Sequence, residues 1–214
     1  MHLNAKLGWL LLAAICIPRF FLVLWANQTG NYGPIGLIML LSAVIPFVLL
    51  TRSGRRDMGL TWPRPVGGLL LALLAGVALS LVLYLIGTGL YGGGYQNWYA
   101  YIGRSYGIPK GLSADELKQL FLIMAGTGMV FSPVGEELYF RGIVHAAFAR
   151  SRGERRATLL DASAFALTHV AHFGLVYVGG GWTLYLLPTL IWVMAMFGAS
   201  LLFTAMKRRT GSLW

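Results

Sequence analysis

Six apolar runs, separated by short polar segments, dominate the pattern of hydrophobic and polar positions along this chain. A helix of about 20 apolar residues is needed to cross the ~30 Å hydrocarbon core of a bilayer. Each run is about that long or longer and has no regular alternation of polar positions. The pattern therefore predicts six membrane-spanning helices, over residues 7–25, 34–50, 66–90, 116–149, 157–178 and 182–206.

Local signals refine two of these helices. Pro18 and Arg19 interrupt the first apolar run. Ser113, followed by two acidic residues, is typical of a helix N-cap, so the fourth helix begins there after a polar and aromatic loop. This helix is longer than one span needs, and we expect Pro133 with Gly135 to kink or break it.

Composition restricts the class of protein. Apolar residues make up 57% of the 214 positions and charged residues only 11%, whereas a soluble domain carries about 25% charged residues. This balance excludes a soluble globular enzyme, a disordered chain and a disulfide scaffold. Long continuous apolar runs exclude an outer-membrane barrel, whose strands alternate. We expect an all-α, polytopic transmembrane bundle that forms a single domain over residues 1–214 and is surrounded by membrane lipids.

The net charge of +10 comes from basic residues gathered after alternate spans. These clusters lie at residues 52–64, 150–156 and 207–209, whereas the loops at 27–33 and 179–181 carry no charge. Basic loops stay in the cytoplasm, so the alternation predicts that both termini are cytoplasmic. We expect a multi-pass protein of a prokaryotic plasma membrane, and no nucleic-acid partner, because binding would need these bases on one folded face.

Ionisable residues inside the predicted spans are the main functional signal. A charge at the bilayer centre costs about 2.5–3.5 kcal/mol on insertion scales, so each needs a reason. Most of them gather in the fourth and fifth spans. They are Arg19, Glu136, Glu137, Arg141, His145, Asp161, His169 and His172.

Two adjacent glutamates in the fourth span have different surroundings on their own helix. Glu137 and Arg141 are four residues apart and share a face, so Arg141 can neutralise Glu137. Glu136 points about 100° away and has no such partner on its helix. A carboxyl group in a low-dielectric site suits general acid–base work, which makes Glu136 the candidate catalytic group. The alternative is that both glutamates pair with arginines and hold helices together.

The fifth span places Asp161, Phe165, His169 and His172 on one stripe. A neutral imidazole can accept a proton from water or orient it, so His169 is the second candidate catalytic residue and His172 a supporting one. Asp161 is expected near the cytoplasmic end, solvated or paired with Arg155 or Arg156. His145 and Arg19 are expected to be structural, and Arg19 is able to extend its charge toward the membrane interface.

The two glutamates and two histidines could also bind a metal. A His-x-x-His pair can hold zinc, but it differs from the His-Glu-x-x-His helix of zinc proteases. As a metal signal this pair is weak, so zinc is possible but not favoured, and no other cofactor is expected.

The order and spacing of two short motifs are similar to those of a known family. Glu136-Glu137-x-x-x-Arg141, followed about 24 residues later by Phe165-x-x-x-His169, resembles the CAAX-protease and bacteriocin-processing family of intramembrane proteases. These enzymes are also called type II CAAX prenyl endopeptidases. The tail from Arg209 to Trp214 resembles the segment that leads into the last motif helix of that family, so the resemblance covers residues 113–214.

The resemblance implies a glutamate-dependent membrane endopeptidase without a metal. Glu136 would activate water and His169 would assist, while Glu137, Arg141 and Phe165 would support them. The substrate would be a peptide or protein, including prenylated or membrane-anchored ones. The family has a further motif, His-x-x-x-Asn, which stabilises the oxyanion, on a helix that would begin where this sequence ends. We therefore expect a truncated sequence or an interrupted gene, with activity reduced or lost.

Two other functions remain open. A non-catalytic relative of the family, such as a bacteriocin-immunity protein or a membrane scaffold, would need Glu136 for binding only. A transporter or proton relay would use Glu136 and His169 to move protons. The second is less favoured because the two halves of the chain show no inverted repeat.

Overall fold

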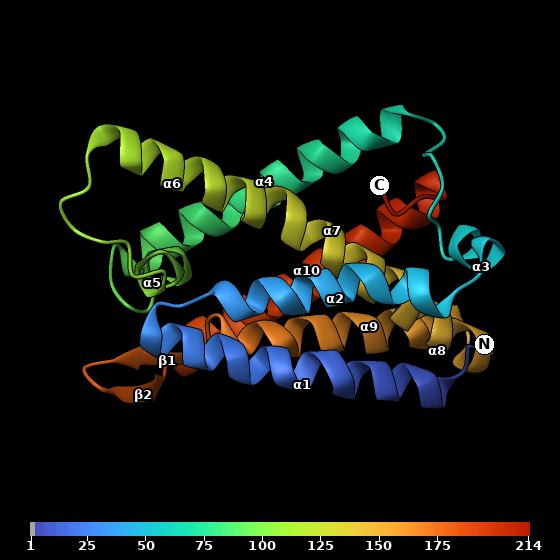
Figure 1. The fold of residues 1–214 in the computed structure, drawn as a ribbon, viewed down its shortest axis with the longest axis horizontal. Helices are drawn as coiled ribbons and strands as arrows, with labels where there is room; N and C mark the ends of the chain where they lie inside the picture. The colour runs from blue at the N-terminus through green and yellow to red at the C-terminus, as the bar shows by residue number, and fades with distance from the viewer. Residues whose placement is uncertain (1–2) are drawn as a thin grey trace.

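The computed structural model describes residues 3–214, which form helices and one short β-hairpin (Figure 1). The hairpin is the one departure from the all-α expectation in this part of the chain. The elements are α1 Ala5–Thr29, α2 Gly33–Leu49, α3 Arg52–Asp57, α4 Gly67–Tyr91, α5 Trp98–Ser105, α6 Ala114–Gly126, π-helical η1 Thr127–Phe131, α7 Ser132–Glu136, π-helical η2 Glu137–Val144, α8 His145–Arg152, α9 Glu154–Thr168, 3₁₀-helical η3 His169–Ala171, β1 Leu175–Val178, β2 Gly181–Leu184 and α10 Leu186–Thr210.

Four helices among the described residues are long and apolar enough to cross a membrane. They are α1, α4, α10 and the continuous helix Ala114–Arg152. α2 is also apolar, but its 17 residues reach only about 25 Å at 1.5 Å per residue. The structure therefore supports a multi-pass helical protein, while the count of six spans remains a prediction.

The predicted fifth span is wrong in its second half. α9 ends at Thr168, and a single 3₁₀ turn and the β-hairpin follow. Gly179 and Gly180 both have positive φ, at 61° and 82°, and form a two-residue turn that is suited to joining antiparallel strands. The apolar, partly β-branched run before them is a strand, and periodicity alone does not separate such a strand from a short buried helix. The last helix accordingly begins at Leu186 and not at Trp182.

The fourth predicted helix is continuous from Ala114 to Arg152. Ser113 and Glu116 form the expected cap, in which each side chain accepts a hydrogen bond from the backbone N–H of the other residue. The expected break at Pro133 does not occur. Two π-helical stretches lie on either side of α7, near this proline, which has no N–H to donate. In the same way, α1 continues through Pro18.

The start of α1 and the end of α10 lie at the same end of the bundle (Figure 1). α3 and α8 are at that end too, whereas α5 and the β-hairpin are at the opposite end. The three basic clusters of the sequence belong to α3, the α8–α9 junction and the end of α10. This arrangement agrees with the predicted alternation of charged loops; which side of the membrane they face stays a prediction.

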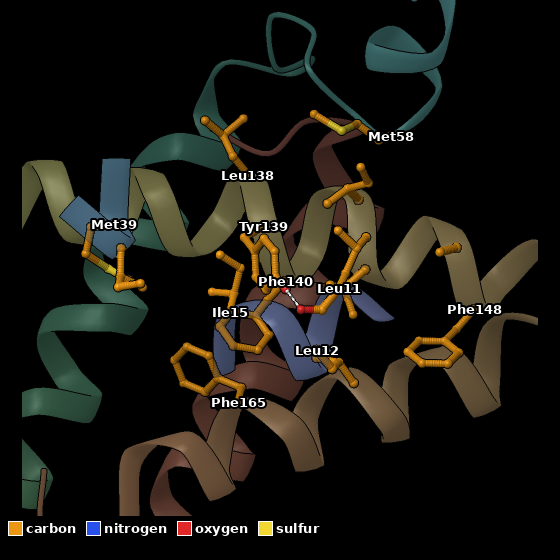
Figure 2. Close-up of a cluster of buried hydrophobic side chains, with 14 of the residues drawn as sticks. Leu11, Leu12, Ile15, Met39, Met58, Leu138, Tyr139, Phe140, Phe148 and Phe165 are labelled. Carbon is orange, nitrogen blue, oxygen red and sulfur yellow. Dashed lines mark hydrogen bonds between the residues drawn. The ribbon is translucent and has the colours of Figure 1, made fainter. Parts of the chain in front are cut away.

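The apolar core lies where α1 passes η2 and α9 (Figure 2). Leu11, Leu12 and Ile15 of α1 are buried beside Tyr139 and Phe140 of η2. The Tyr139 hydroxyl donates a hydrogen bond to the backbone carbonyl of Leu11. This bond satisfies a polar group that would otherwise be buried alone, and it fixes α1 against the helix that carries the two glutamates.

Candidate active site

Glu136 is the last residue of α7 and contacts a cation from the other half of the chain. Arg19 of α1 donates a hydrogen bond from Nη2 to Glu136 Oε1, and the two groups form an ion pair. Glu136 has no partner on its own helix, as the helix-face argument predicted. The Arg19 side chain does not extend outward from the bundle; it is 3% exposed and pairs with Glu136. The buried charges neutralise each other.

His169 lies at the point where α9 tightens into the 3₁₀ turn η3. Its Nδ1 donates a 2.7 Å hydrogen bond to the carbonyl of Phe165, and a carbonyl can only accept, so Nδ1 carries the proton. The lone pair of the neutral ring is therefore on Nε2, which lies 3.9 Å from Glu136 Oε1. Trp192 donates through Nε1 to the backbone carbonyl of His169 at 3.0 Å, which holds the turn from α10.

A cavity of about 680 Å³ contains both candidate catalytic side chains. Arg19, Glu136, His169 and His172 line it, together with apolar residues of α2, the π-helical stretch η1 and Trp192. The rings of His169 and His172 lie 5.5 Å apart between centroids. No contact between His172 and Glu136 is found among the described residues, so His172 belongs to the cavity wall.

A second group of charges lies behind the first, around Arg141. Arg141 is fully buried, and its Nε is 3.4 Å from Glu137 Oε1 and 3.9 Å from Asp161 Oδ2. The predicted contact with Glu137 is present. The expectation for Asp161 was wrong, because its side chain is fully buried and faces Arg141. α9 turns Asp161 into the bundle because it lies on the inward stripe with Phe165 and not on the solvated face.

Phe165 connects the two groups of charges. Its ring lies under the guanidinium of Arg141, 4.1 Å from the ring centroid, and against the imidazole of His169, 4.3 Å between centroids. The rings of Phe203 and Phe140 lie further out, at 5.1 Å and 5.9 Å from the guanidinium. Aromatic faces stabilise a buried cation, so they partly replace water around Arg141.

His145 lies away from this site. Its Nε2 is 3.3 Å from Thr158 Oγ1 and 3.7 Å from a carboxylate oxygen of Glu154. These contacts join α8 to α9 and fit the structural role expected for His145. Among the described residues, no group of three or more His, Cys, Asp or Glu side chains is placed to hold a metal ion.

Gly135, next to the candidate base, permits a close approach between α7 and α2. A Cβ at this position would lie 2.8 Å from the backbone oxygen of Met39. Real Cβ atoms do not approach backbone atoms so closely, and the backbone oxygen of a helix has little freedom to move away. The glycine therefore sets the distance between the helix that carries Glu136 and one wall of the cavity.

One residue of this site was not selected from the sequence. Arg19 was recognised as a charge inside an apolar run, but its partner lies 117 positions away. Only an inter-helix contact identifies that partner, and a single sequence contains no information on inter-helix contacts. The signal that was available is that a mid-span arginine needs a counter-charge, and that Glu136 was the glutamate left without one.

Comparison with known proteins covers the second half of the chain. A family model described as type II CAAX prenyl endopeptidase, Rce1-like, matches residues 118–214. No curated protein and no solved structure matches the chain. The match contains both motifs, and Arg19 lies outside it. The chain is an integral membrane protein, and its residues 118–214 are similar to the Rce1-like type II CAAX prenyl endopeptidase family of intramembrane proteases.

Proposed function

We propose that this chain is an intramembrane endopeptidase in which Glu136 and His169 activate water for peptide-bond hydrolysis. The observation that supports this most directly is the 3.9 Å between Glu136 Oε1 and His169 Nε2, from two different helices, in one cavity. Two hydrogen bonds of about 2.8 Å together span more than this separation. One water molecule can therefore contact both groups.

In the proposed reaction, the carboxylate of Glu136 is the general base and the imidazole of His169 orients the water. The water donates one hydrogen bond to Glu136 and one to His169 Nε2, so its lone pair is free to attack. As the water oxygen bonds to the peptide carbonyl carbon, its proton passes to Glu136 and the carbonyl electron pair moves onto oxygen. The C–N bond then breaks, and Glu136 returns the proton to the leaving nitrogen.

The charges behind the site support this assignment of roles. Glu137 and Asp161 flank the buried cation Arg141, whereas Glu136 faces the cavity. We therefore assign Glu137, Arg141 and Phe165 to holding the α9 turn and η2 together, and His172 to the cavity wall. These four residues take no part in the bond-making and bond-breaking steps that we propose.

The cavity walls suggest the class of substrate. Ile35, Met39 and Phe131 provide apolar surface, and Thr127 and Ser132 provide hydroxyl groups from the long helix. This mixture of apolar surface and hydroxyl groups suits an extended peptide segment that is attached to a membrane anchor. We propose a membrane-anchored peptide or protein as substrate, with prenylated proteins in the class, in the plasma membrane of a prokaryote.

One observation favours a second candidate, a non-catalytic relative that binds a partner or serves as a scaffold. Glu136 is already engaged by Arg19, and such a pair can hold two helices together without any chemistry. The two candidates differ in what happens when the charge of Glu136 is removed but its shape is kept. A hydrolase loses turnover, whereas a scaffold has no turnover to lose.

The experiment uses the full chain in lipid vesicles with a set of internally quenched fluorescent peptides. Half of the peptides carry a C-terminal prenylated cysteine, and half carry the free cysteine. The proposal predicts cleavage of at least one peptide and, in H₂¹⁸O, one ¹⁸O atom in the newly formed carboxylate, detected by mass spectrometry. Absence of cleavage across the set at neutral pH would overturn the proposal and leave the non-catalytic function.

A further inference from the structure

Arg19 is the one charged residue of the site that comes from the first span. It lies outside the region that matches the family model. Its Nη2 contacts Glu136, while Nε and Nη1 are buried and make no hydrogen bond with a described residue. Among the described residues, the Arg19 guanidinium has one counter-charge, which is the candidate catalytic carboxylate.

The contact is made to one particular oxygen. Arg19 Nη2 and His169 Nε2 both lie against Glu136 Oε1. Among the described residues, no hydrogen bond to Glu136 Oε2 is found. The carboxylate is thereby fixed through Oε1, the oxygen that also faces His169 Nε2, and a second lone pair on Oε1 can accept a hydrogen bond from water.

α1 is anchored on both sides of Arg19. The carbonyl of Leu11 accepts the hydrogen bond of Tyr139 on η2, and Asn27 donates through Nδ2 to the carbonyl of Ala171 on η3 at 2.8 Å. Leu11 and Asn27 are each eight residues from Arg19 along α1. One anchor holds the helix that follows Glu136, and the other holds the turn that follows His169. The position of Arg19 relative to both catalytic candidates is therefore set by α1.

The other charged groups near Glu136 are placed differently. Arg141 is engaged with Glu137 and Asp161, and His169 faces the carboxylate with Nε2, the nitrogen that carries the lone pair in the neutral ring. His172 lines the cavity without a contact to the carboxylate, and α2 contributes only uncharged residues to the cavity. Of these groups, Arg19 is thus the permanently charged cation that contacts Glu136.

We infer that Arg19 is a positioning residue of the active site, which holds Glu136 ionised and oriented so that Oε1 faces the water shared with His169. This inference rests on the proposed function of Glu136. It means that the functional unit extends beyond the matched region to include the first span. An opposite charge in contact favours the ionised form of a buried carboxyl group, and a base must be ionised to accept a proton.

The test compares Arg19→Gln and Arg19→Lys with the wild-type protein in vesicles, using the quenched peptide that the wild type cleaves fastest. Arg19→Gln is expected to lower kcat by about 100-fold, as a misplaced catalytic group does, with little change in KM. The acid limb of its pH–activity profile is expected to move to higher pH, because Glu136 then keeps its proton to higher pH. Arg19→Lys, which restores the charge, is expected to return that limb toward the wild-type position. Arg52→Gln changes the same net charge at an exposed site and serves as the control.

A merely structural role gives a different pattern. Loss of folded protein lowers the amount of active enzyme and leaves the pH profile in place. An active Arg19→Gln variant with wild-type kcat and an unmoved acid limb overturns the inference.

A second measurement does not depend on activity. Thermal unfolding of Arg19→Gln, Glu136→Gln and the double variant in micelles reports whether the two side chains act as a pair. We expect the double variant to be at least as stable as Arg19→Gln alone, because it contains no unpaired buried carboxylate. Additive losses overturn the inference even if no peptide is cleaved. Absence of cleavage together with a strong coupling overturns the proposed hydrolysis while the pairing stands.

Discussion

His169 donates a hydrogen bond from Nδ1 to the backbone carbonyl of Phe165, one helical turn earlier, at 2.7 Å. This bond fixes the tautomer of the ring, so that the unprotonated nitrogen faces Glu136. The same residue that supplies the carbonyl also packs its ring against the imidazole, with 4.3 Å between centroids. The backbone of Phe165 thus sets the protonation of His169, and its side chain sets the orientation.

Removal of the His169 imidazole tests its role in orienting water. We expect His169→Ala to lower kcat by about 10²–10⁴-fold, the usual contribution of a positioned acid–base group. His172 lines the same cavity without a contact to Glu136, so His172→Ala is expected to lower kcat much less. Steady-state cleavage of a quenched peptide by both variants measures the difference. Equal losses would show that the distance to Glu136 does not decide the role of the two histidines.

Phe165→Leu separates packing from hydrogen bonding, because it removes the ring but keeps the carbonyl that holds His169. The Arg141 guanidinium loses its nearest aromatic face, 4.1 Å away. We expect the free energy of unfolding to fall by about 2 kcal/mol, the value for a desolvated cation–π contact. Turnover is expected to fall less than in His169→Ala. A variant with wild-type stability would contradict the view that the ring stabilises the buried cation.

Asp161→Asn removes a buried negative charge with almost no change in shape. Arg141 and Asp161 are both fully buried, and no guanidinium nitrogen of Arg141 makes a hydrogen bond with a described residue. Removal of one partner of a buried ion pair costs about 3–5 kcal/mol of stability. We expect the free energy of unfolding to fall by an amount near the lower value, because Glu137 still contacts Arg141. Chemical unfolding in micelles provides the measurement. Arg155→Gln, on the exposed start of α9, is the control and is expected to change stability by less than about 0.5 kcal/mol.

Gly135→Ala tests the close approach of α2 to the helix that bears Glu136. The added methyl group would meet the backbone oxygen of Met39 at 2.8 Å, so the helices must separate. We expect a loss of stability of about 1–3 kcal/mol, as for other overpacked sites, and a lower cleavage rate. Gly126→Ala, earlier in the same helix, meets nothing within 4 Å and is expected to be stable and active. If the two alanine variants behave alike, the approach at Gly135 is not needed.

The local features of the fold could be predicted from the sequence. Apolar runs gave α1, α2 and α4 within a few residues, because a helix that faces lipid is apolar all round. The cap at Ser113 could be predicted from residue types, because its hydrogen bonds join residues only three positions apart. The contact of Glu137 with Arg141 also followed from spacing, because four residues bring two side chains onto one helix face.

The features that were missed depend on contacts between elements. The end of α9 at Thr168 is stabilised from outside, by Trp192 on His169 and by Asn27 on Ala171, and neither contact is visible in local periodicity. The burial of Asp161 depends on Arg141 from another helix. The pairing of Arg19 with Glu136 is of the same kind. The sequence indicated which charges needed partners, but not which partners they had.

The most direct test of the account is the turnover of Glu136→Gln in lipid vesicles. The variant keeps the shape of the side chain and removes its ability to accept a proton. Glu154→Gln, the same change at an exposed glutamate that lies against His145 and Arg208, is the matched control. The account predicts that Glu136→Gln loses at least about 100-fold in kcat while the control retains wild-type turnover. Peptide cleavage by Glu136→Gln at the wild-type rate would contradict it.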